Sequence, residues 1–419
     1  MTPEDRIFLT GLFEAAVAAA DPDIALRPHL PTRPKGRVVV IGAGKGVAQL
    51  AAAFERLWDG PVEGVVVTRY GYGCETRHIR VMEAAHPVPD TAGLAASQAL
   101  FDAVAGLTAD DLVIALVCGG GSALLPMPPG HLTLEDEAAL NEALLASGAP
   151  ISVMNAIRKQ VSGIKGGRLA AACHPARLVS LIVSDVPGDD PAQVASGPTV
   201  PDTKDRAEAR ALVQGWRIAL PPRLADWLAA EEGAAPDPAD RVFATQEVRV
   251  IASAGISLEA AAARAKEAGI SAVILSDAIE GEARDVARVH AALAREVALR
   301  NRPFQRPVVI LSGGETTVTL RGKGRGGRNS EFLLSLALAA EGVPFAALSA
   351  DTDGIDGSED NAGAFADGDS MARLRAMGRD PLADLAENDA WSAFAALDDL
   401  FIPGPTGTNV NDFRAILIR

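Results

Sequence analysis

Two apolar runs in the first part of this sequence end directly in glycine-rich turns, and this pattern constrains the fold more than any other feature. The run 37–41 leads into Gly42-Ala43-Gly44-Lys45-Gly46 and an alanine-rich helical segment, 47–57. The run 112–117 opens into Gly119, Gly120 and Gly121. Strands that alternate with helices in this way favour a parallel sheet. The sequence therefore predicts an α/β protein with ligand-binding loops at the carboxyl ends of its strands.

The length of the chain indicates more than one domain. At 419 residues it is too long for one ordinary core, and we expect two domains. Alanine-rich helices with proline breaks occupy about 202–240, and 231–240 has the composition of a linker. We therefore place a Rossmann-like parallel-sheet domain at 1–240 and a smaller α/β domain at 241–419.

The second domain is predicted to contain a mixed sheet. A short β segment at 318–320 interrupts the alternation of strands and helices there, which argues against a purely parallel arrangement. The other strands that we expect in this domain are 248–252, 272–275, 308–311, 345–349 and 415–418.

Composition excludes several classes of protein. The hydrophobic fraction of 48% and the charged fraction of 22% are those of a soluble globular protein. A net charge of −15 repels nucleic acid, so any phosphate-bearing partner should be a small molecule bound by a local cationic pocket. No apolar run approaches the roughly 18 residues that span a bilayer. The three cysteines lack metal-ligand spacing and cannot all pair, which indicates a reducing compartment, so we expect a cytoplasmic protein. We expect it to be a monomer or a homodimer.

The first glycine turn is a candidate anion site. A strand, a glycine turn and a helix start present backbone N–H groups to an anion. The turn lacks the full dinucleotide fingerprint because Val47 stands where a third glycine or alanine would fall, and it is not a Walker A loop because Lys45 comes too early. A lysine at a helix start is unfavourable unless an anion is bound, so Lys45 favours a functional role.

Three further stretches carry candidate ligand-binding groups. The glycines at 119–121 follow a buried strand, which indicates close backbone approach to a ligand such as phosphate. The stretch 322–331 carries three cations among four glycines, a chemistry that suits an oxyanion, although a solvated turn is the alternative. At helical spacing Arg158, Ser162 and Lys165 would form a cationic stripe, for which a solvated helix face is the alternative.

Acidic residues follow two of the predicted strands. Asp185 and Asp189 come after the run 179–183, where carboxylates can coordinate Mg²⁺ or accept a proton. Asp351 and Asp353 follow a later strand in a spacing close to that of a calcium loop. The loop-closing glutamate is missing there, so calcium is not expected.

Taken together, the motifs resemble the MOFRL-type glycerate kinases, two-domain glycerate 2-kinases often labelled hydroxypyruvate reductases. The resemblance spans nearly the whole chain. It is carried by Gly44-Lys45, His86-Pro87-Val88-Pro89-Asp90, Gly119-Gly120-Gly121-Ser122, Arg158-Lys159, Lys165-Gly166-Gly167-Arg168, Ser184-Asp185-Val186, Gly188-Asp189, Ser196-Gly197-Pro198, Gly326-Gly327-Arg328-Asn329, Thr352-Asp353-Gly354 and 404–412. Gln160, Asp351 and Ser358 depart from the family pattern, which has histidine, glycine and proline there.

The resemblance implies an enzyme that phosphorylates D-glycerate to 2-phosphoglycerate, with ATP and Mg²⁺ and an active site in the cleft between the domains. It implies Lys45 and Arg328 as the key cations, and we assign Asp189 as base or Mg²⁺ ligand, with Asp353 as a rival metal ligand. Nucleotide and phosphate binding is assigned to Gly119, Gly120, Gly121, Ser122, Lys165, Ser196 and Gly197. Substrate binding is assigned to Gly44, Arg158 and Asn329.

Two other classes of function stay open at this point. One is an NAD(P)H-dependent hydroxypyruvate reductase that uses the first glycine turn, with Arg69 at a 2′-phosphate. Val47 and the lack of a ribose-binding acid after the second strand argue against a reductase. A reductase would also give the other glycine loops no role. The other is a non-catalytic sensor of a sugar acid or nucleotide, which would bind without turnover.

Overall fold

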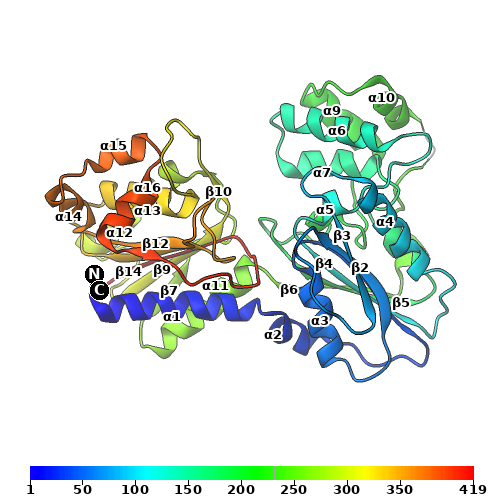
Figure 1. The fold of residues 1–419 in the computed structure, drawn as a ribbon, viewed down its shortest axis with the longest axis horizontal. Coiled ribbons are helices and arrows are strands. Elements are labelled where there is room, and N and C mark those ends of the chain that lie inside the picture. Colours follow the sequence, from blue (N-terminus) through cyan, green and yellow to red (C-terminus); the bar gives the residue numbers. More distant parts are fainter. Residues whose placement is uncertain (231–232) are drawn as a thin grey trace. The chain divides into compact units, whose positions relative to one another are not determined.

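The computed structural model describes residues 1–230 and 233–419 (Figure 1). They form two compact units. The N-terminal unit is Pro22–Ile251, and the C-terminal unit combines Met1–Asp21 with Ala252–Arg419. The predicted division into 1–240 and 241–419 differs from these units at both ends. The predicted linker, 231–240, begins on two residues outside the described ones.

Two segments account for the difference. Helix α1 (Pro3–Ala19) buries Leu9, Leu12 and Phe13 in a core that it shares with α11 (Ala254–Glu267) of the C-terminal unit. Strand β6 (Gln246–Ala252) was predicted as the first strand of the second domain, but it is the edge strand of the sheet in the N-terminal unit. Apolar patterns identify such elements, but they do not show which sheet or helix completes each one.

The sheet of the N-terminal unit has the strand order β3-β2-β1-β4-β5-β6. β1 pairs in parallel with β2 and β4, and the pairs β2–β3 and β4–β5 are parallel as well. The strands before β6 are β1 (Val38–Ala43), β2 (Glu63–Arg69), β3 (Ile79–Ala84), β4 (Leu112–Cys118) and β5 (Arg177–Val183). The order reverses between β1 and β4, as in doubly wound folds, which confirms the predicted parallel sheet.

Strand β3 was not predicted because it has no continuous apolar run. Its sequence alternates apolar residues with Arg80 and Glu83, and it lies at the edge of the sheet. The helices of this unit are α2 (Pro22–Leu26), α3 (Val47–Leu57), α4 (Thr91–Ala103), α5 (Gly121–Leu124), α6 (Leu134–Ala146), α7 (Ile151–Gln160), α8 (Arg168–Ala172), α9 (Arg206–Gly215) and α10 (Pro222–Ala229). The Gly93 N–H donates to Asp90 Oδ1 (3.0 Å), so Asp90 caps α4.

The predicted cationic stripe of Arg158, Ser162 and Lys165 is wrong. Helix α7 ends at Gln160, so the last two residues do not continue its face. Ser162 Oγ instead accepts a hydrogen bond from the Lys165 N–H (3.1 Å), and Gly166 and Gly167 then adopt left-handed conformations that turn the chain.

The sheet of the C-terminal unit is mixed, as predicted. Its order is β13-β12-β11-β14-β9-β7, in which β7 and β9 are parallel and the other pairs are antiparallel. The strands are β7 (Ser271–Ile274), β9 (Val308–Gly314), β11 (Ala346–Asp351), β12 (Gly363–Asp367), β13 (Leu400–Phe401) and β14 (Asp412–Ile418). A separate two-stranded sheet joins β8 (Gly281–Glu282) to β10 (Thr316–Thr317), so the predicted segment 318–320 is not a strand.

Helices cover both faces of this mixed sheet (Figure 1). Successive side chains of a strand point to opposite faces, so Val308 and Ile310 pack in the core with α12 and α13, whereas Val309 and Leu311 pack with α1 and α11. The helices on or beside the first face are α12 (Ala283–Arg300), α13 (Arg328–Ala339), α14 (Ser370–Ala376), α15 (Pro381–Ala386) and α16 (Ala390–Leu397). This double cover explains why every residue of the central strands β9, β11 and β14 is buried.

We expect a buried histidine to make the stability of the protein depend on pH. His290 of α12 lies with Nε2 3.0 Å from Ser312 Oγ, and burial lowers its pKa to about 4. The unfolded chain therefore binds a proton below about pH 6.5 that the folded chain does not bind until about pH 4. The free energy of unfolding should fall across this window by up to about 3 kcal/mol as the pH drops.

Urea unfolding of the His290→Gln variant at several pH values tests this expectation. The variant should show a shallower fall between pH 6.5 and 4 than the unmodified protein. The exposed His78, replaced in the same way, is the control and should leave the slope unchanged. Equal slopes in the His290→Gln variant and the unmodified protein would contradict the assignment.

Candidate functional site

Two of the predicted ligand-binding loops meet at neighbouring strand ends. β1 and β4 are paired, and the loops that follow them carry Lys45 and Gly119. The Lys45 N–H donates to the Gly119 carbonyl (2.9 Å), and Thr68 Oγ1 donates to the Lys45 carbonyl (2.9 Å). The strand order reverses at this place, and open α/β sheets bind their ligands at such reversals.

Glycine is required where these loops touch. A Cβ atom on Gly120 would lie 2.9 Å from Lys45 Cγ and 3.2 Å from His86 Nε2, and Gly120 has a φ of +79°. A Cβ atom on Gly44 would lie 2.4 Å from the Cys118 carbonyl oxygen. The glycines therefore allow the Lys45 side chain and the His86 ring to lie against the backbone of the loop at 119–122, which we call the second loop.

Cations gather at this end of the sheet. Burial, with the charges of Lys45 and Arg69, lowers the pKa of His86. Lys159 and Lys165 of the same unit are ion-paired, but Lys45 has no ion-pair partner among residues 1–230 and 233–419. An unpaired lysine beside glycine backbone is a suitable anion-binding group. The sequence analysis gave His86 only as part of the motif 86–90, and its contact with the loop is seen only in the structure.

Asp185, rather than Asp189, is the acid that lies at the glycine loop. A Cβ atom on Gly119 would lie 1.9 Å from Asp185 Oδ2, so the carboxylate packs directly on the loop backbone. Asp189 lies in the following turn, where its N–H donates to the Val186 carbonyl (3.1 Å). Asp185 comes two positions after β5, the neighbour of β4, and this closeness to the strand end is the signal that could have identified it.

A hydrogen-bonded chain links four polar side chains beside the second loop. Ser122 Oγ and Ser196 Oγ lie 2.9 Å apart, and Ser196 Oγ donates to Asn155 Oδ1 (3.1 Å). Arg158 Nη1 donates to the same Asn155 oxygen (3.1 Å). The structure thus brings together three predicted site residues, Ser122, Ser196 and Arg158. Gly197 follows in a left-handed conformation, and its carbonyl accepts from the Gly167 N–H (2.8 Å).

Lys165 does not fit its predicted role in nucleotide binding. Its side chain is 2% exposed, and Nζ lies 2.7 Å from Oε1 of the buried Glu137. The Glu137 carboxylate also accepts from the Met127 N–H (3.2 Å). The ammonium is therefore committed to a buried ion pair, and we no longer assign it to a ligand.

We expect Lys165→Met to lower the free energy of unfolding by about 3–5 kcal/mol, because it leaves the buried Glu137 carboxylate without its counter-ion. Urea unfolding measures this change. The double variant Lys165→Met with Glu137→Leu removes both charges and should recover most of the loss. A double variant as unstable as the single one would show that the pair is not the cause.

In the C-terminal unit, Arg328 lies among three carboxylates. Its Nε is 2.6 Å from Asp412 Oδ1, its Nη2 is 2.6 Å from Asp351 Oδ2, and its Nη1 is 3.1 Å from Glu315 Oε1. Burial works against the charged form, but the three carboxylates outweigh it and raise the pKa of Arg328. The guanidinium is a fixed cation at the start of α13.

Asp412 joins Arg328 to a second buried arginine. Arg414, which is fully buried, donates to both Asp412 Oδ2 and Thr316 Oγ1, the latter at 3.0 Å. The Thr316 N–H also donates to Asp412 Oδ2 (3.2 Å). These contacts hold the Asp412 carboxylate in place, and the sequence interpretation missed it because Arg328 and Thr316 are more than 80 residues away in the chain.

Asn329 is fully buried and has partners on each side, so its predicted contact with substrate is replaced by a structural role. Nδ2 donates to Asp412 Oδ1 (2.9 Å), and Oδ1 accepts from Ser349 Oγ (2.7 Å). Asp353, the rival metal ligand, accepts from the Ile355 N–H (2.9 Å) and from Asn409 Nδ2 (3.4 Å).

The glycines at 322–327 serve packing more than anion binding. A Cβ atom on Gly322 would lie 2.3 Å from the Glu387 carbonyl oxygen, and one on Gly327 would lie 2.3 Å from Asp356 Oδ1. Asp356 accepts from the N–H groups of Asn329 and Ser330, so it caps α13. Arg325 pairs with Glu359 and lies over the Trp391 ring. Of the predicted oxyanion-binding groups, Arg328 is therefore the one that we retain.

Neither a metal cluster nor a membrane helix emerges from the described residues. Among them, no group of three or more His, Cys, Asp or Glu side chains is arranged to hold a metal ion. No helix in residues 1–230 or 233–419 combines the length and apolar character that crossing a membrane requires.

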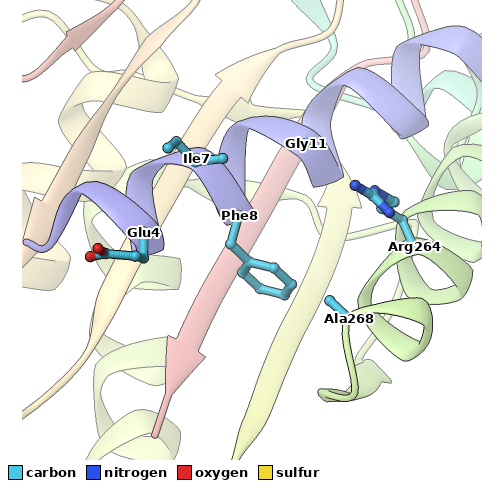
Figure 2. A pocket seen from close by; sticks show the side chains of 6 residues that line it. All are labelled: Glu4, Ile7, Phe8, Gly11, Arg264 and Ala268. Carbon is cyan, nitrogen blue, oxygen red and sulfur yellow. The ribbon is translucent and has the colours of Figure 1, made fainter.

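A cavity of about 300 Å³ lies in the C-terminal unit, apart from these polar groups. Figure 2 shows it beside α1 and α11, and it contains none of the predicted site residues. Its lining residues are Glu4, Ile7, Phe8, Gly11, Arg264 and Ala268.

Comparison with known proteins relates both units to described families. A family model described as a domain of unknown function (DUF4147) matches residues 8–229, and the MOFRL family model matches residues 308–412. An Agrobacterium vitis protein whose name provisionally assigns it as a hydroxypyruvate reductase is 52% identical over 417 residues, which cover 99% of this chain and 94% of that protein. The D-glycerate 2-kinase of Thermotoga maritima is 37% identical over 410 residues, which cover 97% of each. The crystal structure of glycerate kinase from Thermotoga maritima covers all of both chains, with a TM-score of 0.91 and 35% identity.

Proposed function

Because this chain belongs to the glycerate 2-kinase family, whose carboxyl-terminal part is a MOFRL domain, we propose that it transfers a phosphoryl group from ATP to the 2-hydroxyl of D-glycerate. One observation carries the proposal for the site. Lys45, without an ion-pair partner among the described residues, lies against the three-glycine loop where the strand order reverses. Phosphoryl transfer depends on positioning and charge neutralisation, which this arrangement can supply.

In this proposal the loop at 119–122 binds the phosphates of ATP through its backbone N–H groups, and Lys45 neutralises charge on the transferred group. Arg328 binds an oxyanion, either the carboxylate of glycerate or the transferred phosphoryl group. Ser122 and Ser196 help to hold the second loop through their hydrogen bond.

The proposed Mg²⁺ would be bound by one or two carboxylates together with the phosphates of ATP, as is usual for this ion. Asp185 fits this role because its carboxylate packs on the phosphate-binding loop. When bound, Mg²⁺ supplies positive charge to the transferred phosphoryl group. Asp189 stays our alternative as ligand or base, and Asp353 is a weaker alternative because its carboxylate oxygens already accept hydrogen bonds.

A paired assay on the purified protein tests the proposal. We expect glycerate-dependent formation of ADP with Mg²⁺, a product identified as 2-phosphoglycerate, and no oxidation of NADH or NADPH with hydroxypyruvate. Reductase activity without phosphorylation would overturn the proposal and would make the turn at 42–46 a dinucleotide site. The end of β2 argues against that outcome. A dinucleotide site would need a ribose-binding acid at this strand end, but β2 ends in Arg69. The Arg69 guanidinium lies 3.5 Å from the centre of the Tyr72 ring. We further propose a cytoplasmic enzyme that acts on small molecules, as a monomer or homodimer.

A further inference from the structure

The three carboxylates around Arg328 differ sharply in exposure. The side chains of Asp412 and Asp351 are 0% and 7% exposed, whereas that of Glu315 is 51% exposed. The two buried acids bind Nε and Nη2, and the exposed acid binds Nη1. Two nitrogens of the guanidinium are therefore fixed by the protein interior, and the third faces an acid at the surface.

The anchoring of these carboxylates differs in the same way. Asp412 also accepts hydrogen bonds from Asn329, Thr316 and Arg414, and Asp351 accepts from the Asp353 N–H (3.2 Å). Within residues 1–230 and 233–419, the Glu315 carboxylate has Arg328 as its one hydrogen-bond or ion-pair partner. It can therefore move away without breaking any other contact of that kind.

We propose that Glu315 is an internal counter-ion that holds Nη1 of Arg328 until an oxyanion of a substrate takes its place. This inference rests on the proposed function. The incoming anion replaces the negative charge of Glu315 beside the guanidinium. Asp412 and Asp351 hold the guanidinium in the same orientation during the exchange. Glu315 thus lowers the affinity for the anionic substrate and sets which anions can compete for the site.

The class of anion follows from the geometry of the guanidinium. Nε and Nη2 stay on the buried acids, so the incoming anion takes the place of Glu315 at Nη1 alone. A carboxylate or phosphate oxygen can accept a charge-assisted hydrogen bond there, so the competitor is either the carboxylate of D-glycerate or the terminal phosphate of ATP. An exposed ion pair contributes little to stability, so the competition should be modest, and removing it should strengthen substrate binding by about two- to fivefold.

Steady-state kinetics of Glu315→Gln test the proposal. The variant removes the negative charge and keeps the shape of the side chain. We expect a KM about two- to fivefold lower for one substrate, with kcat within twofold of the unmodified enzyme. A lower KM for D-glycerate identifies its carboxylate as the competitor, and a lower KM for ATP identifies the terminal phosphate. Calorimetric titration with D-glycerate or with ATP, each alone, should show the same change in affinity.

Glu341→Gln is the matched control, because Glu341 forms an exposed ion pair with Arg375 elsewhere in the same unit. Its KM values should equal those of the unmodified enzyme. If Glu315→Gln leaves both KM values unchanged, raises either of them, or lowers kcat tenfold, Glu315 is not a displaceable counter-ion. Failure of the proposed function would look different, since the unmodified protein itself would not phosphorylate D-glycerate.

Discussion

Replacing Lys45 with methionine is expected to lower kcat for glycerate phosphorylation by about 100- to 1000-fold, the usual effect of removing one transition-state charge. Methionine keeps most of the length of the side chain, which lies against Gly120, and removes only the ammonium. The free energy of unfolding should change little, because the ammonium has no ion-pair partner within the described part of the chain. Steady-state kinetics and urea unfolding together measure both effects.

Lys35→Met provides the matched control for this experiment. Lys35 is exposed and precedes β1, whereas Lys45 follows it, so the two lysines lie near opposite ends of one strand. The control should retain full activity. If Lys45→Met turned over substrate at a near-normal rate, Lys45 would have no part in the mechanism, whatever the family membership of the chain.

The second large effect is expected for Arg328→Met, and it combines lost activity with lost stability. The kcat should fall about 100- to 1000-fold for the same electrostatic reason. The variant also leaves the buried Asp351 without its cation and Asp412 with Arg414 alone, a change that costs about 3–5 kcal/mol.

Arg328→Lys separates the two effects. A lysine restores one positive charge but cannot reach three carboxylates with a planar fork of donors, so stability should recover in part while kcat stays low. Arg325→Met is the control, because Arg325 is half exposed and pairs with Glu359 at the surface. A kcat for Arg328→Lys close to that of the unmodified enzyme would show that charge alone is required there.

The sequence was informative where a local pattern determines the structure. The helix predicted at 47–57 has those bounds, because a glycine turn starts it and an apolar stripe continues to its end. The sequence also predicted that Lys45 and the glycines at 119–121 follow core strands of a parallel sheet, but their contact is seen only in the structure. The mixed second sheet was predicted correctly, but from a β segment at 318–320 that the structure does not contain.

The sequence was uninformative where the partner of a side chain lies far away in the chain. Lys165 and Arg328 both have the character of ligand-binding cations, but Lys165 is paired with a buried acid 28 positions earlier. The sequence analysis chose Asp189 over Asp185 because only the folded backbone shows which carboxylate reaches Gly119. The glycines around Arg325 were interpreted as an oxyanion site or a solvated turn because the segment near Asp389, on which Gly324 packs, is distant in sequence.

The membership of α1 in the C-terminal unit also has a consequence for the order of events on the ribosome. Helix α1 is synthesised before the N-terminal unit, but the core that it shares with α11 also needs β14, which is synthesised after that unit. The segment Pro22–Ile251 is continuous and can fold as soon as it has emerged. During that interval the apolar face of α1 has no native partner, so the nascent chain exposes an apolar segment that can bind other apolar surfaces until β14 has been made.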